Sequence, residues 1–174
     1  MNWDYLAGYF DGDGSTSIAV VRKKGRIMSL HPMLVFNGSE GTIDEIRDFL
    51  HSHKTISDDN RTYPTAASKK NHWGSEWVLQ INATYSVERL CQELGTLVLE
   101  KKRHLQILLE ILTIKKQLKA EGKQIIDNLN LFIPLRNELH SLAKKGRKEL
   151  LPLQRQELRS KLVREASAAI GVTK

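Results

Sequence analysis

The chain has 174 residues, 40% of them hydrophobic, which is enough for one domain with a core of its own. Its 27 Lys and Arg side chains outnumber 20 Asp and Glu, and the formal net charge of +7 favours a polyanionic partner, either nucleic acid or an acidic membrane surface. No apolar run approaches the ~20 residues of a membrane-spanning helix, which argues against a membrane protein.

The N-terminal residues and the cysteine content indicate an intracellular protein. Asp4, Asp11 and Asp13 make the N-terminus unlike a secretory signal or a basic transit peptide. The single cysteine, Cys91, permits neither an internal disulfide nor a zinc cluster, and its place on an apolar helical stripe over residues 87–94 predicts a small buried side chain. We expect an intracellular location, and a prokaryotic cytoplasm and an organelle are equally compatible with the sequence.

The N-terminal part of the sequence predicts a short helix and a β-hairpin. The helix runs from about Asn2 or Asp4, either of which suits an N-cap, to Asp11. Side chains then alternate with a period of two over residues 16–23 and again in "IMSLHPMLVFN", which predicts two strands. The glycine turn of "RKKGR" lies between them and makes the pair a hairpin. Pro32 cannot donate to a strand ladder, so we expect it at an edge position or a bulge.

A second helix and a second pair of strands come next. The capping box "TIDE" predicts a helix that begins at Thr42. Its apolar face holds Ile43, Ile46, Phe49 and Leu50. "SDDNRTYPT" predicts a loop that enters a weak strand, "NHWGSE" predicts a turn, and the alternation over residues 77–82 predicts a fourth strand.

The remainder of the chain predicts helices. "VERLCQEL" is stopped by Gly95, and "KKRHLQILLEILTIKKQL" carries a row of leucines, Leu105, Leu108, Leu109 and Leu112, on one side. Two amphipathic stretches, residues 134–143 and 152–168, are separated by the basic "KKGRKE". No internal repeat is present. The chain length favours a single domain over residues 1–174, and the order of helices and strands indicates an α+β fold.

The stretch "LAGYFDGDGS" places a carboxylate where a helix ends. Gly12 and Gly14 break the helical pattern around Asp13, and the helix carbonyls there disfavour an anion by roughly 0.3–1 kcal/mol unless a cation comes to meet it. Ala7, Gly8 and Gly12 would let a second copy of the helix approach, which would bring two Asp13 carboxylates and free backbone carbonyls together. Such an oxygen-rich site suits Mg²⁺ rather than zinc.

Two plainer interpretations apply to the same residues. "DGDG" is a common turn composition, and alone it is more often a turn than a metal site. It is also similar to a calcium-binding loop, but the glutamate that such a loop needs is absent, because residues 15–18 run straight into a strand.

"LAGYFDGDG" resembles the signature nonapeptide of the LAGLIDADG homing endonucleases, and the order helix, hairpin, helix, hairpin, helices is similar to the family's core. The resemblance covers about residues 2–118 and implies an αββαββα core with an antiparallel, saddle-shaped sheet, followed by a C-terminal helical extension over about 119–174. A single copy of the motif implies a homodimer whose two sheets straddle double-stranded DNA. The implied activity is metal-dependent double-strand cutting of a long pseudo-palindromic site by an intron-encoded enzyme, with Mg²⁺ as cofactor and Mn²⁺ or Ca²⁺ able to substitute in binding.

The resemblance also implies roles for single residues. Asp13 matches the metal-binding catalytic acid, and Gly12 matches the position that lends a backbone carbonyl to the metal. Lys101 falls where the family places a basic residue near the scissile phosphate, with Lys102 as its rival. Glu40 falls where a polar residue, often glutamine, orders water in the site. The implied dimer interface contains Leu6, Ala7, Gly8, Phe10 and Asp11, and Asp11 is also a helix-capping or packing residue.

A two-stranded ribbon fits the major groove, and the outward side chains of the strands offer donors and acceptors to base edges. On parity and polarity, the expected DNA contacts are Ser17, Lys23, Arg26, His31, Asn37, Arg61, Thr65, Lys69, Asn71, Glu76 and Gln80. Hydrolysis of a phosphodiester adds negative charge that a divalent metal neutralises while it activates water, so no side-chain nucleophile is needed.

Two alternatives remain open. An RNA-binding maturase of the same family would bind intron RNA and assist splicing without cutting DNA, although the retained Asp13 favours cleavage. A DNA-binding regulator without catalysis ranks third, because the linker "AKKGRKELLP" is longer than the usual turn of 3–4 residues in a helix-turn-helix.

Overall fold

The computed structural model describes residues 1–23, 26–57, 62–64 and 77–143. The chain divides into two compact units, Met1–Arg136 and Asn137–Lys174, and the described part of the second unit, residues 137–143, is helical. None of the helices in the described ranges is long and apolar enough to cross a membrane.

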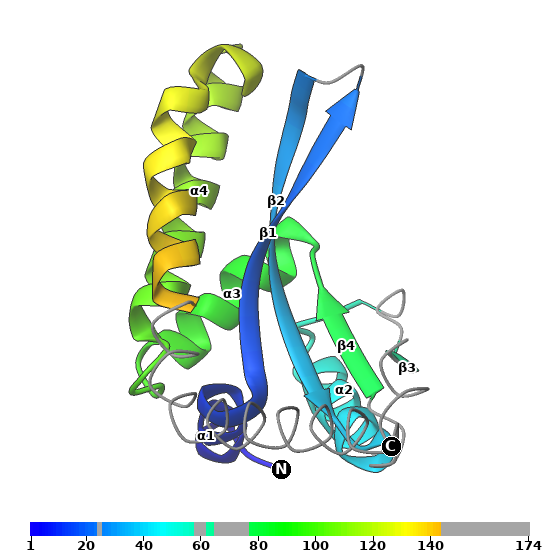
Figure 1. The fold of residues 1–174 in the computed structure, drawn as a ribbon. Coiled ribbons are helices and arrows are strands. Elements are labelled where there is room, and N and C mark those ends of the chain that lie inside the picture. The colour runs from blue at the N-terminus through cyan, green and yellow to red at the C-terminus, as the bar shows by residue number, and fades with distance from the viewer. Residues whose placement is uncertain (24–25, 58–61, 65–76, 144–174) are drawn as a thin grey trace, which may run out of the picture. The chain divides into compact units, whose positions relative to one another are not determined.

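The first unit follows the order that the sequence predicts (Figure 1). Its elements are α1 (Trp3–Asp13), β1 (Gly14–Lys23), β2 (Arg26–Gly38), α2 (Glu40–Ser52), β3 (Thr62–Pro64), β4 (Trp77–Ile81), α3 (Thr84–Gly95), α4 (Lys102–Ala120) and the short 3-10 helix η2 (Ile126–Asn128). A further helix begins at residue 129. The predicted α+β class and the αββαββα order are therefore confirmed.

The four described strands form one antiparallel sheet in the order β1-β2-β4-β3. β1 and β2 make a long hairpin, whereas β4 pairs with β2 only between residues 34 and 38, so the outer half of the hairpin extends past the rest of the sheet (Figure 1). Pro32 lies opposite Ile18 in that outer half, where β1 is the neighbour of β2. This is the edge position expected of a residue that has no N–H to donate.

The core lies between the inner face of the sheet and the helices. Leu34 and Phe36 of β2 pair with Ile81 and Leu79 of β4, and all four side chains are fully buried. Phe10 of α1 meets Phe36 with ring centroids 5.4 Å apart. Full burial of a side chain of this size stabilises the fold by about 1.5–3 kcal/mol. The same alternation leaves the odd-numbered positions of the hairpin on the opposite face.

Several helix boundaries and faces differ from the sequence prediction. α1 continues to Asp13, two residues past the expected end, and α2 begins at Glu40 because Ser39 is its N-cap. The capping box assigned to Thr42 is therefore wrong: the Ser39 Oγ accepts from the Thr42 N–H at 3.3 Å. The helix expected from Pro134 already begins at residue 129, and residues 152–168 lie outside the described residues.

The expected apolar faces are confirmed in most positions. On α2, Ile43, Ile46 and Leu50 are buried, and Phe49 is partly exposed. On α4, Leu105, Leu108 and Leu112 of the predicted row are buried together with Ile107 and Ile111, whereas Leu109 is partly exposed. Cys91 is buried on α3, and burial, with a smaller effect of Glu88, raises the pKa of its thiol to about 12. It is the inert core residue that the sequence predicts.

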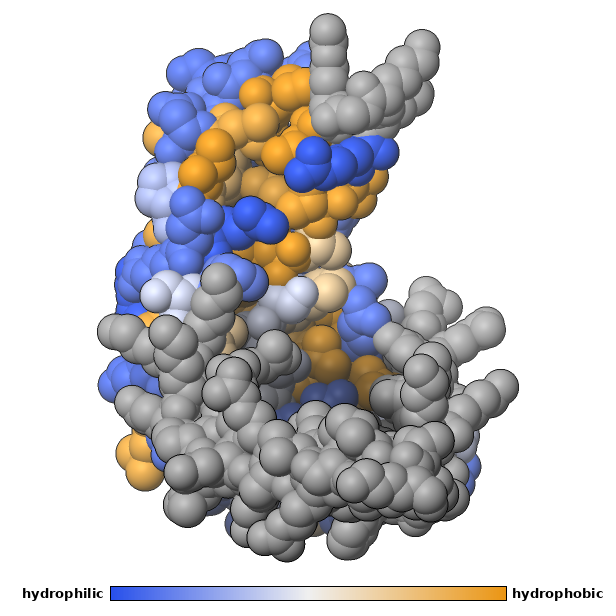
Figure 2. All heavy atoms as spheres, in the orientation of Figure 1, coloured by the Kyte–Doolittle hydropathy of each residue, from blue (hydrophilic) through white to orange (hydrophobic). Residues whose placement is uncertain are grey.

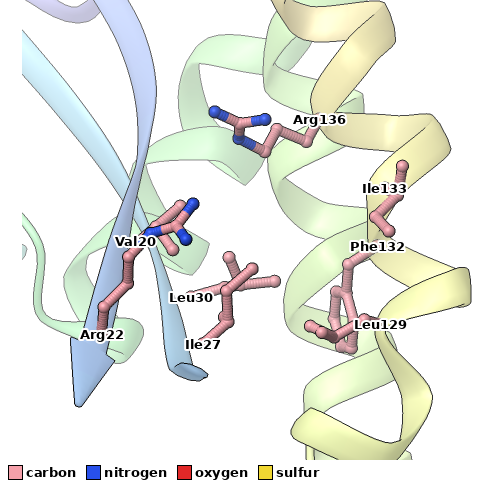
Figure 3. A pocket seen from close by; sticks show the side chains of 8 residues that line it. All are labelled: Val20, Arg22, Ile27, Leu30, Leu129, Phe132, Ile133 and Arg136. Carbon is pink, nitrogen blue, oxygen red and sulfur yellow. The ribbon is translucent and has the colours of Figure 1, made fainter. Parts of the chain in front are cut away.

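A small cavity of about 50 Å³ separates the outer half of the hairpin from residues 129–136 (Figure 3). The pairing of β1 with β2 slips by one residue between Val21 and Arg22, which turns Ile27 to the helix side of the hairpin. Apolar side chains form most of the lining, and Arg22 and Arg136 contribute to its border. Figure 2 shows an apolar surface over the same region, bordered by hydrophilic residues. The part of the hairpin that lines the cavity, residues 20–30, lies far from α1 (Figure 1).

Candidate active site

Helix α1 ends at the residue that the sequence singled out. Asp13 is the last residue of the helix, and Gly14 caps it by donating its N–H to the Phe10 carbonyl. The Asp13 carbonyl accepts from the Asn37 Nδ2 at 3.2 Å, and the Asn37 carbonyl accepts from the Tyr9 hydroxyl at 2.5 Å. The backbone of Asp13 is thus tied to the end of β2, while the residue itself is exposed to solvent.

Burial raises the pKa of the Tyr9 hydroxyl, and the negative charge of Asp13 acts in the same direction. The Tyr9 proton that is donated to Asn37 is therefore firmly held. Gly38 makes this contact possible, because a Cβ at that position would overlap the Tyr9 hydroxyl. Tyr9 belongs to the site although no local pattern indicates its role, since its partner lies 28 residues away.

A cation does meet the C-terminal end of α1, and it is the ammonium group of Lys101. Its Nζ donates to the carbonyls of Phe10 at 2.7 Å, Asp11 at 2.5 Å and Gly12 at 3.4 Å. The same nitrogen lies 5.6 Å from the centroid of the Phe10 ring. Burial lowers the pKa of Lys101, and the carboxylates of Asp11, Glu100 and Asp13 oppose that shift.

Asp11 makes the complementary contact. Its carboxylate accepts backbone N–H groups from Leu99 at 2.7 Å, Lys101 at 3.0 Å and Glu100 at 3.4 Å. These groups lie directly before α4, whose N-cap position, Lys101, has no side-chain cap of its own. The capping role implied for Asp11 is what the structure shows.

Most of the residues expected at a dimer interface are inside the chain instead. Leu6, Ala7 and Phe10 are 0%, 2% and 0% exposed, so they belong to the core of one copy and the interface prediction is wrong for them. Asp11 is engaged with the start of α4. Gly8 is exposed, and a Cβ placed there would meet nothing within 4 Å, so it alone of this set stays available to a second copy.

The oxygen atoms at the end of α1, the Asp13 carboxylate and the Gly12 carbonyl, are of the type that binds divalent cations such as Mg²⁺. Asp13 is exposed, and the Gly12 carbonyl keeps only the longest of the three Lys101 contacts. In the described ranges, no group of three or more His, Cys, Asp or Glu could hold a metal ion. Mg²⁺ commonly keeps several waters and uses one or two carboxylates with substrate phosphates, so a single open carboxylate suits it.

The other residues assigned to the site lie near its edges. Glu40 is the exposed first residue of α2, two positions after Gly38, and Lys102 is the exposed first residue of α4. His104, which the sequence did not indicate, lies in the first turn of α4, and its buried Nδ1 has no hydrogen-bond partner among the described residues. Burial lowers the pKa of His104, and the Lys101 charge lowers it further.

Comparison with known proteins gives no match at the level of sequence and clear matches at the level of structure. No protein-family model matches the chain, and no curated protein does. The archaeal intron-encoded homing endonuclease I-Vdi141I, complexed with DNA, matches with a TM-score of 0.59 and 18% identity over 80% of this chain and 82% of that one.

Two further structures agree. The homing endonuclease I-CvuI, in complex with the I-CreI target, matches with a TM-score of 0.56 and 14% identity over 80% of each chain. The LAGLIDADG homing endonuclease I-GzeII, in complex with its DNA target, matches with a TM-score of 0.59 and 14% identity over 78% of this chain and 44% of that one. The chain has the fold of the LAGLIDADG homing endonucleases.

In this LAGLIDADG fold, the residues expected to contact DNA separate into three groups. Ser17, His31 and Gln80 lie on the face of the sheet opposite its buried core residues: Ser17 and His31 are at odd hairpin positions, and Gln80 lies opposite Val35. Gln80 also donates its Nε2 to the Met33 Sδ on that face at 2.8 Å. The second group is Asn37 alone, whose side chain donates to the Asp13 carbonyl.

The third group is not described at the level of side chains. Lys23 and Arg26 are paired residues at the outer end of the hairpin. The remaining expected contacts, Arg61, Thr65, Lys69, Asn71 and Glu76, lie outside the described residues.

Proposed function

We propose that the chain is a site-specific DNA endonuclease that needs a divalent cation, for which Mg²⁺ is the best candidate, and that it acts as a homodimer. The observation that carries the proposal is Asp13, an exposed carboxylate on a fixed backbone at the end of α1. The open face of the adjoining sheet and the net charge of +7 support a DNA partner. The three proteins of like fold described above were solved in complex with DNA.

In this proposal, Asp13 and the Gly12 carbonyl hold the cation, and the second copy supplies the same groups across a two-fold axis. A bound divalent cation supplies charge neutralisation at the phosphate and lowers the pKa of attacking water. The task of the protein is to hold the Asp13 carboxylate still, and Tyr9, Asn37 and Lys101 do so through the backbone.

Intron homing is the biological role that we infer for such an enzyme. It is supported by the archaeal intron-encoded enzyme of like fold. Intron RNA is the partner of the alternative function, in which the chain assists splicing and cuts no DNA.

The decisive comparison is between the wild type and Asp13→Asn on a library of candidate insertion sites, with Mg²⁺ and with EDTA. Loss of the carboxylate charge should reduce cutting by at least about 100-fold, which is the usual scale for removing one electrostatic catalytic group. Sequencing of the ends reads out the cuts and identifies the site. The matched control is Asp4→Asn, which changes an exposed aspartate in the first turn of the same helix.

Discrete Mg²⁺-dependent double-strand cuts that vanish in Asp13→Asn and persist in Asp4→Asn would support the nuclease. Cuts that persist in Asp13→Asn would contradict the assignment of the metal-binding acid. Absence of cutting by the wild type, together with tight binding of structured intron RNA, would instead make the maturase the correct function.

A further inference from the structure

The C-terminal end of α1 and the segment before α4 provide hydrogen-bond partners for each other's backbone groups. The last turn of a helix has carbonyls without partners, and the first turn of the next has N–H groups without partners. Asp11 on α1 accepts N–H groups that precede α4, and Lys101 before α4 donates to carbonyls at the end of α1. We call this pair of contacts, formed by Asp11 and Lys101, the helix-end clamp.

The ammonium of Lys101 is fully engaged in the helix-end clamp. An ammonium has three N–H donors. Three carbonyl oxygens, those of Phe10, Asp11 and Gly12, lie within 3.4 Å of the Lys101 Nζ. The centroid of the Phe10 ring lies 5.6 Å from the same nitrogen. A phosphate oxygen could therefore be bound only after one of these contacts to α1 had been broken.

The position of Asp13 explains what the clamp achieves. Asp13 adds a negative charge to a helix end that is already negative, and this combination is unfavourable without a cation nearby. The positive charge of Lys101 interacts with the Asp13 carboxylate as well as with the carbonyls of the preceding residues. Asn37 secures the Asp13 carbonyl from the opposite side, from the end of β2.

We propose that Lys101 is a positioning residue, which holds the last turn of α1 so that Asp13 is presented to the metal and does not itself contact the scissile phosphate. The proposal rests on the proposed nuclease function for its purpose, but the geometry that it invokes exists in the free protein. Lys102, which is adjacent and exposed, makes no such contact to α1 among the described residues.

The test is amide hydrogen exchange on the full-length chain without DNA or metal, in Lys101→Met and in the matched control Lys102→Met. Loss of a charge-assisted contact should make the amides of residues 11–14 exchange about tenfold faster in Lys101→Met. Lys102→Met should exchange as the wild type does. Lys101→Arg keeps the positive charge but presents a planar guanidinium, so its rates should lie between those of the wild type and of Lys101→Met.

Asp11→Asn provides a second test that does not depend on the folding of Lys101→Met. It weakens the other half of the clamp, so exchange should accelerate at residues 99–101 and also at residues 11–14. Acceleration confined to residues 99–101 would overturn the proposal, as would unchanged exchange in a folded Lys101→Met.

Cleavage assays on the same variants separate this proposal from the proposed function. If Lys101→Met loses cutting while its exchange equals that of the wild type, Lys101 acts on the phosphate and the positioning role is wrong. If the wild type cuts no DNA but residues 11–14 loosen in Lys101→Met, the clamp stands and the nuclease assignment fails.

Discussion

Two glycines of the site are fixed by close contact. A Cβ at Gly14 would overlap the Phe10 ring and lie 2.7 Å from the Phe10 carbonyl oxygen, and Phe10 is fully buried and cannot move aside. The backbone of Gly14 is extended, with φ at −73°, so the constraint comes from this contact and not from the backbone angle. The other is Gly38, beside the Tyr9 hydroxyl. At Gly41 in α2, by contrast, a Cβ would meet nothing within 4 Å.

Gly14 and Gly41 should therefore respond in opposite ways to alanine. We expect Gly14→Ala to lower the free energy of unfolding by about 1–3 kcal/mol through overpacking. Gly41→Ala should raise it by about 0.5–1 kcal/mol, because alanine is the better helix residue. Urea unfolding followed by circular dichroism measures both. Equal effects of the two substitutions would show that Gly14 is not closely packed.

Two histidines make stability depend on pH. Burial, with Lys101 for His104 and with Lys115 for His31, lowers the pKa of each below the ordinary 6.5. Below about pH 6.5 the unfolded chain therefore binds more protons than the folded chain. The free energy of unfolding should fall as pH drops from 6.5 through the lower folded pKa values, and this part of the stability is fully present above 6.5.

Replacement of a histidine should flatten that dependence. Between pH 7 and pH 5, the free energy of unfolding should decrease less in His104→Gln than in the wild type. The same should hold for His31→Gln. Denaturant titrations at closely spaced pH values give the slope. Above pH 7.5 the free energy of unfolding should depend on pH in the same way in the variant and the wild type. Identical slopes below pH 6.5 would show that His104 does not contribute to the pH dependence.

At the scale of elements, the start of α2 shows where local sequence signals compete. Ser39 and Thr42 can both cap a helix, and the glutamate that follows Thr42 by three positions favours it as the cap. The structure uses Ser39, which bonds the Thr42 N–H at 3.3 Å and the Thr42 hydroxyl at 2.8 Å. The longer helix begins at Glu40, so only Ser39 separates it from the end of β2.

Alanine substitutions distinguish the two caps. Ser39→Ala should reduce the free energy of unfolding by about 1 kcal/mol, because one N–H at the start of α2 loses its acceptor. Thr42→Ala should cost less, since the side chain of a residue inside the helix is not its cap. The comparison is made by thermal unfolding of the two variants side by side, and the reverse order would restore the cap at Thr42.

The order of elements could be predicted from the sequence because each element has its own local pattern. The alternation over residues 16–23 predicts the first strand of the hairpin. The glycines around Asp13 predict the approximate end of α1. The contacts of Lys101 to α1 could not be predicted, because "EKKRH" is typical of a solvated charge run and the partners of Lys101 lie 89 to 91 residues away. Burial of Leu6 and Phe10 likewise depends on how α1 packs, which no local pattern reveals.

At the scale of the whole molecule, the exposed face of α1 bears on assembly. Gly8 and Gly12 are one helical turn apart, both are exposed, and a Cβ at either position would meet nothing within 4 Å. A helix surface of this kind allows another backbone to approach closely. The proposed homodimer would use it, with the Asp13 residues of the two copies at the same end.

A leucine at Gly8 tests this arrangement without disturbing the single copy. Gly8→Leu should fold normally, yet it should weaken the dimer by about 2 kcal/mol or more, since a bulky side chain would stand between the two helices. Sedimentation velocity over a range of concentrations measures the change, with Gly41→Leu on α2 as the control. A Gly8→Leu protein that still forms a dimer would place the interface elsewhere.

The helix-end clamp also determines when in folding the candidate site can form. Its contacts join residues that are 88 to 91 positions apart, so they close a loop that contains the whole sheet. Closing such a loop carries an entropic cost that is recovered only when the intervening elements are already in place. A nascent or partly unfolded chain would therefore lack the contacts of Lys101 to the end of α1, even where Asn37 already holds the Asp13 carbonyl. An enzyme assembled in this order would be inactive toward DNA until its own folding was complete.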